Sequence, residues 1–153
     1  MVENMKIIAL NKKASFEYFI EDKYEAGIVL TGTEIKSIRL GKCNINDAYV
    51  RIKNVEAYII NMNISKFAQG NIHNHEETRE RKLLLHKNEI LKLSGYVDKD
   101  GYTLIPLKLY LKEGLAKIEV GVCRGKKLHD KRDSLKEKDM NRRIEKQLKQ
   151  INY

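Results

Sequence analysis

The alternation of hydrophobic and polar residues predicts a body made mainly of short β-strands. We expect strands over residues 25–32, 48–52, 56–62, 102–112 and 116–122. The second and third strands are joined by only three residues, and the last two by a short turn that contains glycine, so both pairs are predicted to be hairpins.

The strand at 102–112 carries the strongest period of two. Its apolar set is expected to face the core, and the only proline, Pro106, is expected at an edge or a bulge because proline cannot donate to a strand ladder. The expected core face consists of Ile105, Leu107, Leu109 and Leu111.

Two segments have a helical period. The first covers 34–40, with Thr33 as its predicted N-cap and Gly41 in the left-handed conformation that follows a helix. The second covers 86–97, and the leucines before it are expected to enter the core as extended chain.

These elements predict a mainly β fold. Strands interrupted by two or three short helices fit an antiparallel barrel of the oligonucleotide-binding (OB-like) type. Residues 1–123 form the expected barrel domain and residues 124–153 a basic C-terminal tail. Residues 63–81 follow neither period, and we interpret them as a long functional loop.

The tail has one thin apolar stripe at helical spacing, too narrow to hold a helix in water by itself. We expect it to be disordered in the free protein and to become helical against a polyanion; a helix packed on its own barrel is the alternative. The stripe consists of Leu135, Met140, Ile144, Leu148 and Ile151.

Charge concentrates in the same tail. The whole chain has a formal charge of +9. Residues 124–153 hold 11 Lys and Arg against 5 Asp and Glu, whereas residues 1–123 hold 19 against 16. A cationic extension on a nearly neutral body indicates a polyanionic partner, either nucleic acid or an anionic membrane surface.

A cytoplasmic location is expected. No apolar run approaches the roughly 20 residues of a membrane span, and the N-terminal residues lack the apolar stretch of a secretory signal. Cys43 and Cys123 are far apart and outside any CxxC motif, so we expect free thiols in a reducing compartment.

Candidate catalytic and metal motifs are weak. GVCRGK at 121–126 has one residue too few between its glycines for a phosphate-binding loop and lacks the following Ser or Thr, so we interpret Gly121 and Gly125 as strand-end and hinge positions. His73 and His75 lack metal-ligand spacing and are interpreted as solvated. We therefore expect no enzyme activity, no cofactor and no metal.

Two groups of residues each allow two interpretations. In TRERK, Arg79, Arg81 and Lys82 are either a solvated charge cluster or phosphate contacts. The aromatic residues near the first strand either stack on bases or pack in the core. These aromatic residues are Phe16, Tyr18, Phe19 and Tyr24.

Four stretches together resemble one known family. They lie at 11–42, 79–90, 103–122 and 124–133, and include EAGIVLTGTE, RKLLLH and GKKLHDKR. On these residues the chain resembles the SsrA-binding proteins (small protein B) of bacterial trans-translation, over nearly its whole length. One departure is Phe16, which stands where the family has a histidine.

The resemblance implies an RNA-binding adaptor. Its barrel would grip the tRNA-like domain of transfer-messenger RNA in the A site of a stalled ribosome, with elongation factor Tu delivering the charged RNA. The tail would reach the decoding centre and the empty mRNA channel and become helical there, and no membrane would be involved.

The resemblance also assigns residues by position. The RNA-binding set is Asn11, Glu25, Lys82, Leu84 and Lys117. The set for the decoding centre and mRNA channel is Gly125, Lys126, Lys127, His129, Asp130, Lys131 and Arg132. Two rival hypotheses are a general single-strand-binding barrel with a basic tail, and a structural protein bound permanently to ribosomes.

Overall fold

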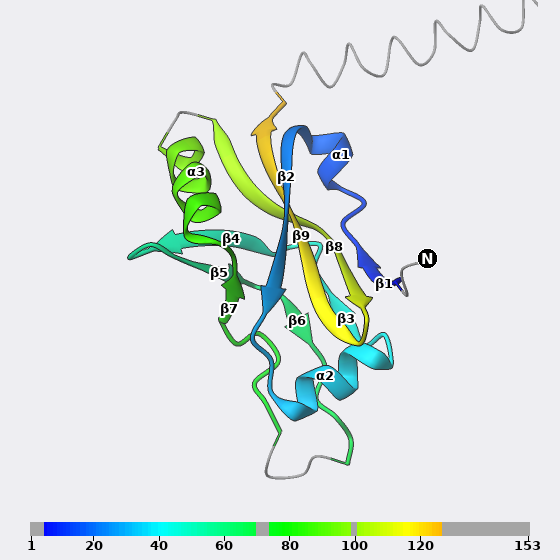
Figure 1. The fold of residues 1–153 in the computed structure, drawn as a ribbon. Coiled ribbons are helices and arrows are strands. Elements are labelled where there is room, and N and C mark those ends of the chain that lie inside the picture. Colours follow the sequence, from blue (N-terminus) through cyan, green and yellow to red (C-terminus); the bar gives the residue numbers. More distant parts are fainter. Residues whose placement is uncertain (1–4, 70–73, 99–100, 127–153) are drawn as a thin grey trace, which may run out of the picture.

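The computed structural model describes residues 5–69, 74–98 and 101–126 (Figure 1). The prediction for the tail from residue 127 onward therefore lies outside the described residues. In chain order the elements are β1 (Met5–Leu10), α1 (Ala14–Glu17), β2 (Tyr18–Ile28), α2 (Gly32–Arg39), β3 (Cys43–Asn44), β4 (Tyr49–Lys53), β5 (Glu56–Ile60), β6 (Asn63–Ile64), β7 (Arg81–Leu84), α3 (Lys87–Val97), β8 (Tyr102–Lys112) and β9 (Leu115–Gly125).

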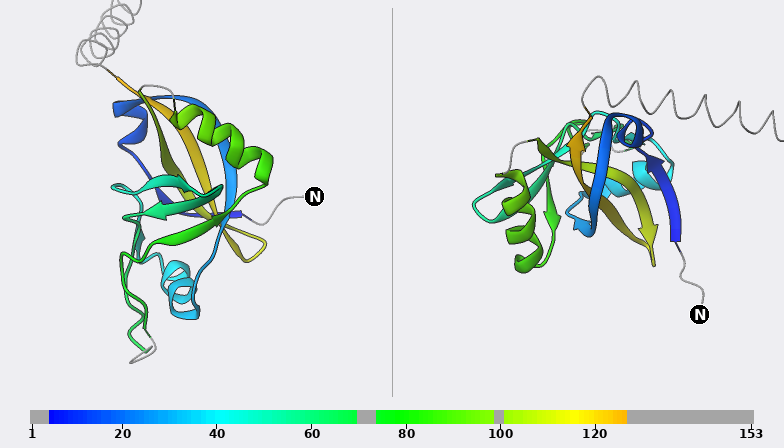
Figure 2. Two further views of the ribbon diagram at one scale, coloured as in Figure 1. Left: turned by 90° about the vertical axis from the view of Figure 1, so that its left-hand side faces the viewer. Right: turned by 90° about the horizontal axis from the view of Figure 1, so that it is seen from above.

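The fold is mainly β, as predicted. Seven strands form one antiparallel sheet in the order β1-β8-β4-β5-β7-β2-β9, and β9 also pairs with β8. Following the pairings from β8 through β4, β5, β7, β2 and β9 therefore returns to β8, while β1 adds to β8 from outside this circuit. Figures 1 and 2 place α1 and α2 at opposite ends of the sheet, and α3 packs against β8 and β4.

Both predicted hairpins are confirmed. The turn between β4 and β5 places Asn54 and Val55 at φ values of 53° and 59°, and the turn between β8 and β9 places Glu113 and Gly114 at 53° and 81°. Two consecutive left-handed residues match the twist of the flanking strands. Val55 is unusual in this conformation because its branched Cβ crowds the backbone.

The bulge predicted at Pro106 is confirmed, and the predicted core face is confirmed at Leu109 and Leu111 but not at Ile105 and Leu107. The pairing of β8 with β9 shifts between Pro106 and Lys108. A shift of one residue moves side chains to the opposite face of a sheet. Leu109 consequently packs in the main core, whereas Ile105 and Leu107 belong to a second, smaller cluster.

The first helix is confirmed with a different cap. Thr31 is the N-cap of α2, not Thr33, and it forms a capping box with Glu34. The Thr31 N–H donates to Glu34 Oε1 at 2.9 Å. The preceding strand β2 spans Tyr18–Ile28, so it begins seven residues earlier than the predicted strand at 25–32 and ends before the cap at Thr31. Gly41 has the predicted left-handed conformation, with φ at 74°.

The structure also confirms the second predicted helix, α3, which ends at Val97 as expected. It confirms as well that the chain before α3 is extended, in β7, where Leu83 enters the core. The last strand is longer than predicted, because β9 runs to Gly125. Gly121 is therefore inside the strand rather than at its end. A Cβ at Gly121 would lie 2.7 Å from Leu107 Cδ1, so glycine permits the close approach of β8.

Candidate nucleic-acid interface

A groove opens where β7 ends and α3 begins, and it brings three of the predicted RNA-binding residues together. It occupies about 400 Å³. Its predicted members are Glu25 of β2 and Lys82 and Leu84 of β7. We call it the β7–α3 groove, and its lining residues are Glu25, Val55, Glu56, Lys82, Leu83, Leu84, Leu85, His86, Glu89 and Ile90.

Strand β7 determines which side chains reach this groove. Its residues alternate between buried and exposed positions, so Lys82 and Leu84 share the outer face while Leu83 fills the core. Leu84 is 55% exposed, which is unusual for a leucine in a central strand. A Cβ at Gly27, the residue paired with Leu84, would lie 3.2 Å from Leu84 Cβ. The glycine thus leaves room for the leucine beside it.

The groove is also polar. Lys82 Nζ lies 3.2 Å from Glu56 Oε1, on the neighbouring strand β5. Tyr110 donates a hydrogen bond to Glu25 Oε2, and Lys112 Nζ is 3.7 Å from the same oxygen. The surface therefore offers hydrogen-bond donors and acceptors around an apolar side chain.

Electrostatics keep Glu25 ionised at neutral pH. The hydrogen bond from Tyr110 lowers the pKa of the Glu25 carboxyl, and the charges of Lys112 and Lys117 lower it further, against a smaller opposing effect of burial. Lys117 pairs with Gly27 in the β2–β9 ladder, which explains its influence on Glu25. An ionised carboxylate among lysines can accept from an amino group or a 2′-hydroxyl while the lysines attract phosphate.

Asn11 lies apart from these residues. It is 9% exposed, its Nδ2 donates to the Pro106 carbonyl at 3.1 Å, and its backbone N–H donates to the Leu107 carbonyl. Asn11 Oδ1 is buried and has no hydrogen-bond partner among the described residues. The residue lines a second hollow, with Tyr18 and Tyr49, that shares no lining residue with the β7–α3 groove.

Of the predicted tail set, the structure describes the first two residues. Gly125 ends β9, and Lys126 follows it with its N–H donating to the Glu17 carbonyl at 3.0 Å. The remaining five predicted residues lie outside the described part of the chain. They are Lys127, His129, Asp130, Lys131 and Arg132.

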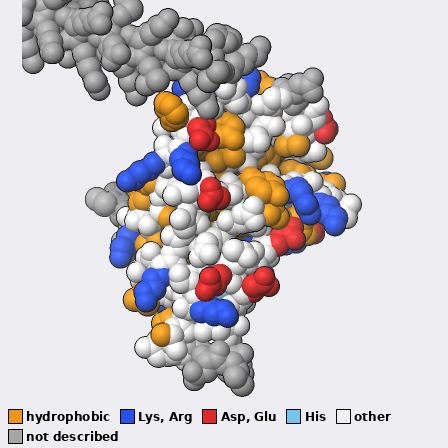
Figure 3. All heavy atoms as spheres, turned by 180° about the vertical axis from the view of Figure 1, so that it is seen from behind, with side chains coloured by type: hydrophobic (Ala, Val, Ile, Leu, Met, Phe, Trp, Pro, Cys, Tyr) orange, Lys and Arg blue, Asp and Glu red, His pale blue; other side chains and the backbone are white. Residues whose placement is uncertain are grey.

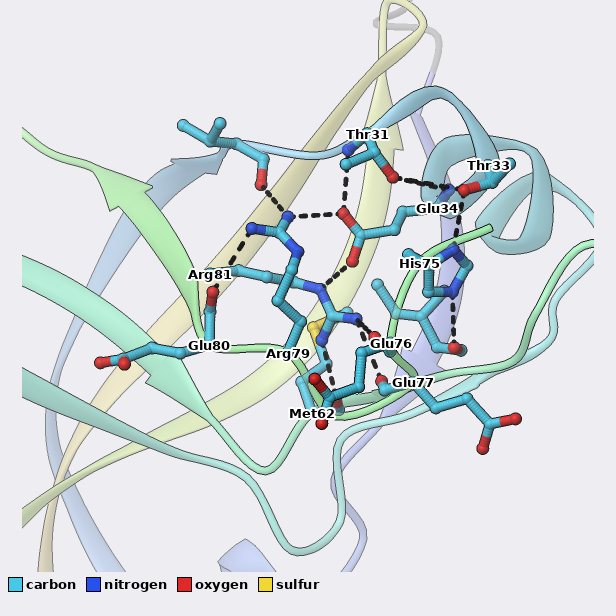
Figure 4. Close-up of polar contacts among 12 residues, drawn as sticks. Thr31, Thr33, Glu34, Met62, His75, Glu76, Glu77, Arg79, Glu80 and Arg81 are labelled. Atoms are coloured by element: carbon cyan, nitrogen blue, oxygen red, sulfur yellow. Dashed lines mark hydrogen bonds and ion pairs between the residues drawn. The ribbon is translucent and has the colours of Figure 1, made fainter. Parts of the chain in front are cut away.

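The arginines of TRERK have a third role, which differs from both the solvated charge cluster and the phosphate contacts considered for them. Arg81 is 0% exposed and forms an ion pair with Glu34, which is also fully buried (Figure 4). Arg79 lies 2.6 Å from the other oxygen of Glu34. We call Glu34, Arg79 and Arg81 the buried ion-pair network. It joins the start of α2 to the start of β7.

Arg81 also fixes the loop that precedes it. Its Nη1 donates to the Met62 carbonyl at 2.7 Å and its Nη2 to the Glu77 carbonyl at 3.0 Å. Burial alone would raise the pKa of Glu34, but hydrogen bonds from Arg79, the Thr31 N–H and Arg81 outweigh burial and lower it. The carboxylate is therefore charged, which is the state that a paired arginine requires.

His75 was predicted to be solvated, and that prediction is wrong. It is 7% exposed, with Nδ1 2.8 Å from Thr33 Oγ1 and Nε2 2.8 Å from the Ile64 carbonyl oxygen. Because a carbonyl only accepts, Nε2 carries a proton. The ring links the helix α2 to β6 (Figure 4). His73 lies outside the described residues.

Three further observations concern metal binding, membrane spans and the cysteine thiols. The described residues contain no group of three or more His, Cys, Asp or Glu side chains placed to hold a metal ion. None of the helices in that part of the chain is long and apolar enough to cross a membrane. Both cysteines are free thiols there, and burial raises the pKa of Cys43 and of Cys123 to about 11.

Sequence reasoning missed the buried ion-pair network, although two signals for it were present. TGTE at 31–34 is a capping-box pattern starting at Thr31, and Arg81 stands two residues before Leu83, on the same face of β7. A charged residue in register with a core leucine indicates burial with a partner.

The fold and groove define a β-rich binding module whose surface combines an exposed leucine with charged donors and acceptors. Residues 8–150 match the protein family described as "SmpB protein". The SsrA-binding protein of Thermoanaerobacter pseudethanolicus is 57% identical over 97% of this chain and 95% of its own. The SsrA-binding protein of Alkaliphilus oremlandii is 58% identical over 95% and 94%.

A solved structure agrees with these relatives. A chain from the work headed "tmRNA-SmpB: a journey to the center of the bacterial ribosome" has a TM-score of 0.68 and 42% identity, covering 82% of this chain and 92% of that one. The chain belongs to the SmpB protein family, and the resemblance predicted from its sequence motifs is confirmed.

Proposed function

We propose that the protein is an RNA-binding adaptor of trans-translation. It binds the tRNA-like domain of transfer-messenger RNA and brings that RNA to the A site of stalled ribosomes. The observation that carries this proposal is the 57% identity to an SsrA-binding protein over 97% of the chain. The solved chain from a tmRNA–SmpB structure is a second, independent support.

We further propose that the body is a small barrel of the OB type. The support is the pairing of β8 with both β4 and β9, which closes a circuit of strands. In such barrels one strand face binds the nucleic acid. The outer faces of β2 and β7, which carry Glu25 and Leu84, would supply that face.

In this proposal the β7–α3 groove holds the RNA. Leu84 offers an apolar surface to a base, Glu25 accepts from a base amino group or a 2′-hydroxyl, and Lys82 and Lys117 face phosphates. Asn11 would act indirectly, since its amide is buried against the bulge at Pro106.

The tail would act on the ribosome. We propose that Gly125, Lys126, Lys127, His129, Asp130, Lys131 and Arg132 belong to the segment that meets the decoding centre and mRNA channel. Elongation factor Tu would deliver the charged RNA, and the site of action would be the bacterial cytoplasm. The excess of cations after residue 123 supports a polyanionic partner such as ribosomal RNA.

The test separates the two binding steps in full-length protein. Leu84→Ala is expected to weaken binding to the tRNA-like RNA, because truncating a well-placed apolar contact typically costs about 1–2 kcal/mol, or roughly 5- to 30-fold. Leu91→Ala is the matched control, since Leu91 is 53% exposed but does not line the groove. Equal RNA affinity of the two variants would contradict the assignment of the groove.

The reciprocal variant replaces Lys131 and Arg132 with alanine. It is expected to keep the affinity for free RNA within about twofold and to abolish peptide tagging on ribosomes programmed with a message lacking a stop codon. Competition with bulk tRNA completes the test. Equal affinity for all RNAs would favour a general single-strand-binding protein over the adaptor.

A further inference from the structure

Two of the last described residues, Arg124 and Lys126, contact one partly exposed aromatic ring. Phe19, in β2, is 37% exposed. The guanidinium carbon of Arg124 lies 5.2 Å from its ring centroid, and Lys126 Nζ lies 5.0 Å from the same centroid. Both distances are within the range of cation–π attraction. We call Phe19, Arg124 and Lys126 the exit clamp.

Neighbouring strands hold Arg124 in place. Arg124 is paired with Phe19 across the β2–β9 ladder and with Tyr102 across the β8–β9 ladder. Its Nε lies 3.4 Å from Glu21 Oε1, and the Tyr102 hydroxyl donates to Glu21 Oε2 at 2.7 Å. The guanidinium therefore lies between an aromatic face and a carboxylate that is itself oriented.

The backbone beyond Arg124 is fixed as well. The Gly125 N–H donates to the Gly101 carbonyl at 3.3 Å, and the Lys126 N–H donates to the Glu17 carbonyl at 3.0 Å. Lys126 Nζ lies 3.4 Å from the Ser15 carbonyl oxygen. The chain up to Lys126 is thus tied to α1, to Phe19 of β2 and to Gly101, the residue before β8.

We propose that Phe19 is a positioning residue that sets where, and in which direction, the C-terminal segment 127–153 leaves the body. A fixed starting point raises the effective concentration of a tethered segment at its target, and pre-organisation reduces the ordering cost of binding. The inference rests on the proposed function, because the target of that segment is the ribosome while the groove holds the RNA.

The first test measures the clamp itself by amide hydrogen exchange in the full-length protein. Phe19→Leu keeps an apolar side chain but removes the aromatic face, whereas Phe19→Tyr keeps that face. We expect exchange at Gly125 and Lys126 to rise about tenfold in the leucine variant, the size of two exposed cation–π contacts. The tyrosine variant is expected to match the wild type. Unchanged exchange in Phe19→Leu, or an equal rise in both variants, overturns the proposal.

The second test measures the consequence. Because the weakened clamp leaves the segment's starting point free for a larger share of the time, tagging at limiting protein is expected to fall about twofold or more in Phe19→Leu. Its affinity for the tRNA-like RNA should stay within twofold, and Phe19→Tyr should tag normally. Insertion of two glycines between Lys126 and Lys127 should reduce tagging in the wild type and add little to Phe19→Leu.

The outcomes distinguish the two proposals. Faster exchange with unchanged tagging, or a loss of RNA affinity equal to the loss of tagging, refutes the positioning role. A wild-type protein that neither binds the RNA nor supports tagging refutes the proposed function instead, and the exchange experiment then still decides whether the clamp exists.

Discussion

Replacing Arg81 tests whether the buried ion-pair network holds the end of the long loop to the body. Arg81→Met keeps similar bulk but removes the charge and every donor. The loss leaves the carbonyls of Met62 and Glu77 without the bonds they receive at 2.7 and 3.0 Å, and Glu34 with one arginine. Breaking a buried pair in this way typically costs about 3–5 kcal/mol. Since Glu34 keeps Arg79 and the Thr31 N–H, we expect about 3–4 kcal/mol.

The assay is urea unfolding followed by circular dichroism, with two matched controls. Arg79→Met removes a partly exposed partner of the same carboxylate, so its expected cost is about 1–2 kcal/mol. Arg51→Met removes an exposed arginine 3.9 Å from Glu80 and should cost under about 0.5 kcal/mol. If Arg81→Met costs no more than Arg79→Met, the reasoning from burial is refuted.

Three further predictions follow from named residues. Folding lowers the pKa of Glu34 below its ordinary 4.5, so the contribution of its charge to stability is complete above about pH 5 and is lost as the pH falls. The free energy of unfolding should therefore decline less between pH 6 and pH 3.5 in Glu34→Gln than in the wild type. Val55→Gly should stabilise the protein by about 0.5–1 kcal/mol in thermal unfolding, since φ of 59° strains a branched side chain, and a destabilised variant would contradict this. Lys82→Met and Lys117→Met should each reduce the slope of log affinity for the RNA against log salt by up to about 1. Lys42 is exposed and does not line the groove, so Lys42→Met should leave the slope unchanged in the same titration.

Local signals in the sequence predicted much of the fold. The hairpins were predictable because two short turns separate alternating runs, and the bulge at Pro106 because proline lacks a ladder donor. The consequence of that bulge was not predictable from the period alone. A shift of one residue sends Leu107 and Leu109 to different clusters, and the partner strand decides where the shift occurs.

Long-range partners account for the wrong predictions at Arg81 and His75. Arginine and histidine in an irregular segment are usually solvated, and the partner of Arg81 lies 47 residues away, in a helix cap. His75 similarly bonds Thr33, which is 42 residues distant. Three residues of the predicted RNA-binding set line the β7–α3 groove, but the resemblance that assigned the set did not reveal that the Asn11 amide bonds the carbonyl of Pro106.

The distribution of charge connects these observations to selectivity. Within the body, the arginines of the network are matched to Glu34, and Lys82 and Lys112 are close to Glu56 and Glu25. Figure 3 shows the same mixture on the back of the molecule, where Lys and Arg side chains stand among Asp and Glu with hydrophobic side chains between them. A surface of this kind attracts polyanions weakly. In the function proposed above, the groove would therefore recognise its RNA through apolar contact and hydrogen bonds that depend on shape. Unselective attraction is concentrated after residue 123, which holds 11 basic and 5 acidic residues. If the groove selects and the cationic segment attracts, high salt should reduce binding to the ribosome more steeply than binding to the free RNA.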